Sequence, residues 1–204
     1  LRAPQAIALS AVRGFVATET EQALLRSLAL CERVERDGAG RPPELLPTLF
    51  GLWTFNITRG RIWLARDYAL RLEQEGQGDP DSDAALAATA ALHITCFFLG
   101  ELTTARAHAE SLLHRYRRER HQRLAYLYGF DLEVMCGGYL GHCLWYLGHV
   151  AQARPVYERA VACAREISHP YSLTFAMFAA GVFAQGLQDV AAVRELSQSL
   201  HHIA

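Results

Sequence analysis

Along most of the chain, apolar residues recur three or four positions apart, and polar residues fill the positions between them. This spacing places the apolar side chains on one face of an α-helix, and no segment shows the strict alternation typical of a half-buried strand. The pattern therefore predicts an all-α fold of ten helices in five antiparallel pairs. The pairs cover residues 3–14 with 20–36, 43–59 with 62–76, 82–99 with 102–119, 131–147 with 150–167, and 171–186 with 189–203.

Helix boundaries are marked by proline, glycine and capping residues. The stretches RPPELLP (41–47), GDPDSD (78–83) and SHPY (168–171) interrupt the helical pattern. Thr18 with Glu21, and Ser82 or Asp81, are expected N-caps.

A glycine followed five residues later by an alanine recurs along the chain, with 40 and then 48 residues between successive glycines. Each glycine lies between two apolar-periodic stretches. We therefore expect it to end one helix with a positive φ, while the small alanine lets the next helix pack back closely. The pairs are Gly60 with Ala65, Gly100 with Ala105, and Gly148 with Ala153.

The segment 140–160, LGHCLWYLGHVAQARPVYERA, shows the repeat most fully. Leu140 and Gly141 precede Gly148, and Ala153, Tyr157 and Ala160 follow it. This arrangement resembles the tetratricopeptide repeat. The resemblance implies a superhelical solenoid in one domain, with repeats at about 1–38, 42–78, 82–120, 130–168 and 170–204.

The other copies depart from the pattern. Trp53 and His93 stand at the position of Gly141 in the second and third repeats. The fifth repeat keeps Gly181 there but has Gln188 as its turn residue and Val193 in place of the alanine. The first is the most degenerate, with Gly14 before a longer loop and Ala23 in its second helix.

The tetratricopeptide register implies that the first helix of each pair lines an inner surface. Two interpretations of these side chains stay open: an apolar groove that receives an amphipathic helix or peptide, and aromatics buried between adjacent helices. The inner positions are Phe50, Thr54, Ile57, Ile94, Phe97, Phe98, His142, Trp145, Tyr146, Phe175, Phe178 and Gln185.

Composition narrows the classes of protein and partner. The formal charge of −1 argues against a general attraction to nucleic acid or acidic lipid. The sequence contains no run of about 18 uncharged apolar residues, which argues against a membrane span. The five cysteines, in apolar helical contexts without CxxC spacing, favour a reducing cytoplasm. Because the chain starts at Leu1 without a signal-like segment, we expect an excerpt of a longer protein.

Candidate chemistry is sparse. His93 with Cys96, and His142 beside Cys143, lack a second pair at metal-site spacing, so we expect no metal and no cofactor. No nucleotide-binding or hydrolase motif is present, and we expect no enzymatic activity. The basic run RYRRER (115–120), with Arg123, is interpreted either as a contact for phosphate or an acidic partner, or as solvated arginines at a helix C-terminus.

Four stretches resemble the helical-repeat region of large bacterial signalling ATPases. They are residues 44–72, 92–113, 121–148 and 164–183, and the most specific parts are the connection 121–134 and the stretch 51–55. Leu132 and Glu133 depart from the proline and glycine that the family tends to carry. In that family an AAA/STAND-type ATPase module is joined to a class III adenylate/guanylate cyclase or a Ser/Thr kinase domain. The resemblance implies a regulatory arm that itself binds no ATP.

The sequence therefore predicts a non-catalytic, cytoplasmic protein-interaction module whose partner is a protein or peptide, including another domain of the same chain. The alternative is a small-molecule sensing arm of a STAND-type regulator, with a closed pocket near Asn56, His142 and Tyr146. Pairing of two copies through exposed end faces stays open.

Overall fold

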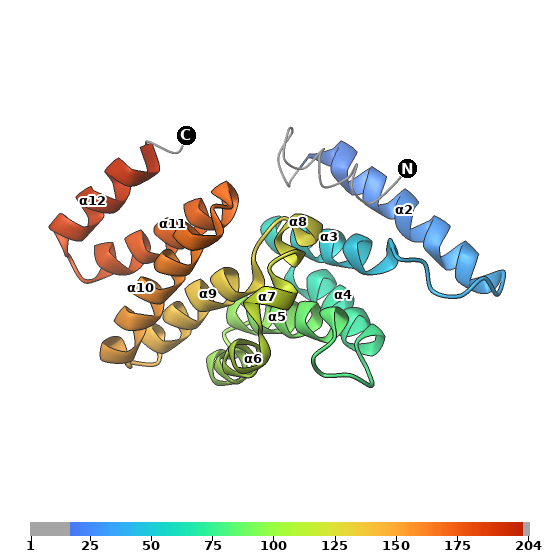
Figure 1. The fold of residues 1–204 in the computed structure, drawn as a ribbon, viewed down its shortest axis with the longest axis horizontal. Coiled ribbons are helices and arrows are strands. Elements are labelled where there is room, and N and C mark those ends of the chain that lie inside the picture. The colour runs from blue at the N-terminus through green and yellow to red at the C-terminus, as the bar shows by residue number, and fades with distance from the viewer. Residues whose placement is uncertain (1–16, 202–204) are drawn as a thin grey trace. The chain divides into compact units, whose positions relative to one another are not determined.

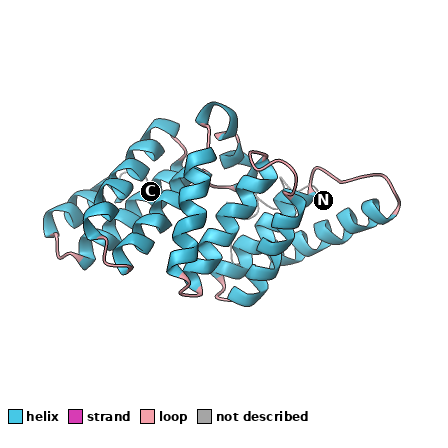
Figure 2. Cartoon of the chain, turned by 90° about the horizontal axis from the view of Figure 1, so that it is seen from below, coloured by secondary structure: helices cyan, strands magenta, loops and turns pink. Residues whose placement is uncertain are grey.

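The computed structural model describes residues 17–201. The predicted helix 3–14, Gly14 and the last residues of the helix predicted at 189–203 lie outside the described residues. Residues 17–201 contain eleven helices and no strand, which confirms the all-α prediction (Figure 2). The chain divides between Leu99 and Gly100 into two compact units, and each is described by itself.

The N-terminal unit is built around α3, which packs against its three neighbours (Figure 1). The apolar residues of α3 lie almost all around the helix, so it is buried on most sides. By contrast α4 buries a single stripe and faces solvent with the rest. The helices are α2 (Thr18–Arg36), α3 (Leu45–Thr58), α4 (Ile62–Glu75) and α5 (Asp83–Phe98).

The C-terminal unit has its core where α6, α9, α10 and α11 meet. α9 packs against each of the other three, and α12 packs on α11. The helices are α6 (Leu102–Arg115), α7 (Arg118–His121), α8 (Leu124–Tyr128), α9 (Leu132–Tyr146), α10 (Val150–Ile167), α11 (Pro170–Gly186) and α12 (Val190–His201).

Residues with positive φ end the first helix of the hairpins, as predicted. Gly60, Gly100 and Gly148 have φ of 71°, 79° and 84°. Gln188, which replaces glycine in the fifth repeat, has φ of 58°. At Gly148 the next amide, His149 N–H, donates to the Leu144 carbonyl oxygen at 2.7 Å, a hydrogen bond that closes the helix end.

The alanines after these turns are buried, and each lies in the second helix of its pair. In α4 the buried residues are Ala65, Ala69 and Leu72, and in α6 they are Ala105, Ala109 and Leu112. Each residue of the second set lies 40 positions after its counterpart in the first. The sequence repeat is therefore also a repeat of burial.

The prediction of one helix over 102–119 was wrong at its C-terminal end. α6 ends at Arg115, because Tyr116 turns to an extended conformation with ψ of 129°. The buried Tyr116 hydroxyl donates to Asp131 Oδ2 at 2.6 Å and ties the chain to the start of α9. The segment 116–131 between α6 and α9 contains two short helices, α7 and α8.

The N-cap expectations had different outcomes. Ser82 caps α5, since its hydroxyl accepts the Ala85 N–H at 3.2 Å. The expectation for Thr18 was wrong. Thr18 is the first residue of α2, and the N-cap residue is Ala17, which makes no side-chain capping hydrogen bond. Glu21 instead pairs with Arg61, the N-cap residue of α4, at 2.7 Å, an ion pair that joins α2 to the start of α4.

Candidate functional site

The structure divides the predicted inner-surface residues of the N-terminal unit into packed and exposed ones. Phe50 and Ile94 are each 1% exposed, and Thr54 is also buried. Ile57 and Phe97 are half-buried, while Phe98 of α5 is 45% exposed. Phe50, Ile94 and Thr54 are therefore packing residues of the N-terminal unit.

Trp53 explains why these side chains are packed. Its ring lies 4.9 Å from that of Phe50, and its indole N–H donates to Thr95 Oγ1 at 3.0 Å. The Thr95 hydroxyl in turn donates to the Ala91 carbonyl oxygen at 2.7 Å. This chain of hydrogen bonds ties α3 to α5 and buries the aromatic side chains between them.

In the C-terminal unit, aromatic side chains of α9 and α11 form a partly exposed surface, which we call the aromatic face. Tyr146 is 55% exposed and Phe178 is 59% exposed. Tyr139 of α9 joins the two helices, since its ring lies 5.5 Å from that of Phe175. The six residues of the aromatic face are Tyr139, His142, Tyr146, Tyr171, Phe175 and Phe178.

Helical spacing places these side chains together. Tyr139, His142 and Tyr146 follow one another by three and four residues on α9. Tyr171, Phe175 and Phe178 follow by four and three residues on α11. Gly138 permits the approach of the helices, because a Cβ there would lie 2.8 Å from the Phe175 ring.

His142 is a buried, neutral member of the aromatic face. Its Nδ1 shares a hydrogen bond with the Tyr157 hydroxyl, and its ring stacks on Tyr146 with a centroid distance of 6.2 Å. Burial lowers the pKa of His142 to about 4, so the imidazole is uncharged at neutral pH. The six residues of the aromatic face therefore carry no formal charge under these conditions.

Trp145, predicted to contact a partner, has a packing role. Its ring lies 5.6 Å from the Phe183 ring of α11. It also covers Gly186, where a Cβ would come within 2.1 Å of the indole. Trp145 therefore anchors the end of α9 on α11. Gln185, also predicted on the inner surface, is exposed near the end of α11.

Sequence reasoning missed Tyr139 and Tyr171, which extend the aromatic face by one turn on each helix. Both stand at helical spacing before residues that were predicted, His142 and Phe175. Tyr171 also meets Phe130, with 4.8 Å between ring centroids. Continuing the periodicity one turn toward each helix N-terminus identifies them.

The arginine run 115–120 is held partly by ion pairs within the C-terminal unit. Arg118 contacts Glu166 of α10 and lies 3.4 Å from Glu133 of α9. The hydrogen bond to Glu166 is the main cause that raises the pKa of Arg118 above its ordinary value. Arg117 donates to the carbonyl oxygen of His114 at 2.7 Å, as expected for an arginine at a helix C-terminus.

The candidate metal ligands lie in packed surroundings. His93 and Cys96 are buried on α5, and Cys143 is buried on α9. No three His, Cys, Asp or Glu side chains gather as a metal site anywhere in residues 17–201. The five cysteines all lie within the described range, where each is buried and none forms a disulfide, and burial raises the pKa of Cys163 to about 12.

Comparison with known proteins adds no assignment. No protein-family model matches the chain, and no curated protein matches it.

None of the helices between residues 17 and 201 combines the length and the apolar character that crossing a bilayer requires.

Proposed function

We propose that the protein is a non-catalytic interaction module with a tetratricopeptide-like arrangement of helix hairpins. Its aromatic face on α9 and α11 binds the apolar side of an amphipathic helix. The observation that carries this proposal is the exposure of Tyr146 and Phe178 beside the half-buried Phe175 and Tyr139. Aromatic side chains that are partly exposed at a surface are typical of protein interfaces.

The hairpin geometry supports the tetratricopeptide-like part of the proposal. Positive-φ residues recur at Gly60, Gly100, Gly148 and Gln188, and buried alanines follow the three glycines. Stacked hairpins of this kind present the first helix of each pair on one side. α9 and α11 are both first helices of their pairs.

The partner's chemistry follows from the face. Six uncharged aromatic side chains favour leucine, methionine, phenylalanine or isoleucine at i, i+3, i+4 and i+7 of a helix. Such a helix could belong to a separate protein or to another domain of the same polypeptide. A cytoplasmic location agrees with five buried cysteines that form no disulfide.

The experiment is a selection of displayed amphipathic helices on the purified protein, followed by binding assays with the double variant Tyr146→Ala/Phe178→Ala. Both side chains are more than half exposed, so their removal should preserve the fold. We expect selected helices to bind the wild-type protein and to lose at least tenfold in affinity with the double variant. Trp63→Ala, which removes a 67%-exposed aromatic from α4, is the matched control and should bind normally.

Two results would refute the proposal. One is failure to enrich any helix with an apolar stripe. The other is equal binding by the wild-type protein and the double variant. Trp145→Ala is unsuitable for this test, because the loss of its contacts with Phe183 and Gly186 would disturb the α9–α11 packing itself.

The parent protein proposed here is a bacterial multidomain signalling ATPase of the AAA/STAND type with a cyclase or kinase domain. The support is the resemblance of residues 44–72, 92–113, 121–148 and 164–183. Within 121–134, Asp131 is buried and caps α9 by accepting the Val134 N–H at 3.0 Å. Sequencing the flanking region of the gene tests this proposal, which requires a phosphate-binding GxxxxGK[ST] loop in the same polypeptide.

A further inference from the structure

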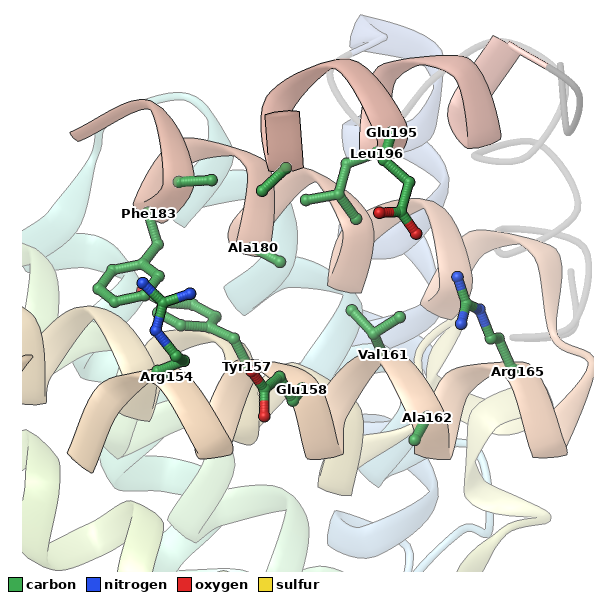
Figure 3. Close-up of a pocket in the computed structure, with 12 residues that line it drawn as sticks. Arg154, Tyr157, Glu158, Val161, Ala162, Arg165, Ala180, Phe183, Glu195 and Leu196 are labelled. Atoms are coloured by element: carbon green, nitrogen blue, oxygen red, sulfur yellow. The ribbon is translucent and has the colours of Figure 1, made fainter. Parts of the chain in front are cut away.

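A pocket of about 340 Å³ lies among α10, α11 and α12 in the C-terminal unit (Figure 3). Val161 of α10, Ala180 of α11 and Leu196 of α12 line its middle. Tyr157 and Phe183, stacked with ring centroids 4.7 Å apart, line one end. None of the six residues of the aromatic face is among the lining residues, so this pocket is a separate site.

The loose seating of α12 produces the space. No residue of α12 is buried, although its apolar stripe faces α11 and the core near Leu196 and Leu200. α12 therefore covers α11 while leaving part of α10 uncovered beneath it.

Charged side chains of opposite sign stand on two walls of the pocket. Arg165 extends from α10 and Glu195 from α12, on the same side of the pocket (Figure 3). Among the described residues, no ion pair within 4.0 Å involves either of them. At the other end Arg154 is already engaged, since it lies 4.0 Å from Asp189 and 5.9 Å from the centre of the Phe183 ring.

We propose that this pocket binds a zwitterion with a large apolar group, in chemical class a free α-amino acid with an aromatic or branched side chain. The carboxylate pairs with the guanidinium of Arg165, and the ammonium group pairs with the carboxylate of Glu195. The apolar side chain lies over Val161 and Leu196 toward the Tyr157 and Phe183 rings.

Charge balance and size both support this ligand class. Arg165 and Glu195 are both exposed, and a zwitterion can pair with both of them, whereas a ligand with only one charge can pair with only one. The volume lies at the small end of the range of about 300–1,000 Å³ typical of ligand pockets. An amino acid of the size of phenylalanine or leucine suits such a space.

The test is calorimetric titration of the purified protein with L-phenylalanine and L-leucine. Three related compounds separate the contributions: N-acetyl-L-phenylalanine lacks the ammonium charge, L-phenylalaninamide lacks the carboxylate, and glycine lacks the apolar group. We expect binding of phenylalanine or leucine, with affinity at least tenfold lower for each of the three. No binding of either amino acid, or equal binding of glycine, would overturn the proposal.

Two adjacent alanines provide a matched pair of variants. Ala192 lines the pocket, so Ala192→Leu should fill it and abolish binding. Ala191, the preceding residue of α12, is exposed and does not line the pocket, so Ala191→Leu should bind as the wild type does. Equal binding by both variants would place the ligand elsewhere and refute the assignment.

The charged residues provide a second pair. Arg165→Gln and Glu195→Gln should each lower the affinity for the preferred amino acid at least tenfold, while Arg194→Gln on the exposed side of α12 should leave it unchanged. Unchanged affinity in the first two variants would refute the proposed pairing. The inference uses no residue of the aromatic face, so its failure leaves the proposed helix binding intact. Binding of an amino acid in this pocket would identify the class of ligand for the alternative function, a small-molecule sensing arm.

Discussion

The Tyr157 ring of α10 lies directly over Gly141 of α9, so that a Cβ built on Gly141 would come within 2.5 Å of the ring carbon Cζ. Both residues are buried, and Tyr157 also reaches His142 through its hydroxyl. The second repeat reverses the sizes: Trp53 stands at the position of Gly141, and Ala69 stands at that of Tyr157. All four residues are buried, so a large residue on one helix accompanies a small one on its partner.

The Gly141–Tyr157 contact predicts that Gly141→Ala destabilises the protein by about 1–3 kcal/mol, because the added methyl group overpacks the core. Gly181 is the equivalent residue of the fifth repeat and has open space around it. Gly181→Ala should therefore stabilise the protein by up to about 1 kcal/mol, the usual gain in a helix interior. Urea unfolding of both variants checks the prediction, and the same sign of change in both would contradict it.

Gln188 has a backbone conformation that glycine adopts more easily, with φ of 58°. Its side chain is exposed, so little packing is lost on its removal. We expect Gln188→Gly to stabilise the protein by a few tenths to about 1 kcal/mol. Gln185→Gly, at an exposed position inside α11, should instead destabilise it by about 1 kcal/mol. Thermal unfolding measures both, and a loss of stability in Gln188→Gly would count against the strain at this turn.

His142 makes the stability depend on pH. Its pKa is about 4 in the folded protein, against an ordinary value of 6.5, so protons bind the unfolded chain first as the pH falls. The contribution of His142 to the free energy of unfolding is complete above about pH 6.5 and is lost as the pH falls toward 4. This loss amounts to roughly 3 kcal/mol.

Urea unfolding of the wild type and of His142→Gln at several pH values isolates this contribution. The comparison is needed because desolvation also lowers the pKa of His169. The wild type should lose more stability between neutral pH and about pH 4.5 than the variant does. Parallel pH profiles of the two proteins would show that His142 titrates normally.

The Trp53–Thr95 hydrogen bond predicts a difference between two substitutions of Thr95. Thr95→Val keeps the shape of the side chain but leaves the buried indole N–H without its acceptor, at a cost of about 1–3 kcal/mol. Thr95→Ser keeps the hydroxyl and should cost less. Denaturant unfolding and the NMR shift of the indole proton compare the two variants, and an equal loss of stability in both would contradict a specific contribution of the hydroxyl acceptor.

Helix positions and turns followed from local signals in the chain. Apolar periodicity located the longer helices of residues 17–201 to within a few residues, except at the end of α6, and it did not predict α7 and α8. The glycine–alanine pairs identified hairpin turns, and even Gln188 could be placed by its spacing. These features depend on backbone conformation and on nearest neighbours along the chain, which is why a single sequence suffices to infer them.

The connection 115–131 shows where local signals fail. Nothing in its composition indicates that Tyr116 ends α6 by bonding to Asp131, or that the Asp131 N–H donates to Ser172 Oγ at 3.0 Å. Arg118 likewise joins residues 15 and 48 positions away in the chain. Such contacts form only when distant helices have packed.

Helical periodicity alone thus predicted the all-α class, the hairpin turns and four of the six residues of the aromatic face, without Tyr139 and Tyr171. It could not separate Phe50 and Trp145, which are packed, from Tyr146 and Phe178, which are exposed, because all four occupy equivalent-looking apolar positions. Packing against residues distant in sequence decided that difference. The same holds for the pocket under α12, since a cavity arises from how helices fit together and leaves no periodic mark in the chain.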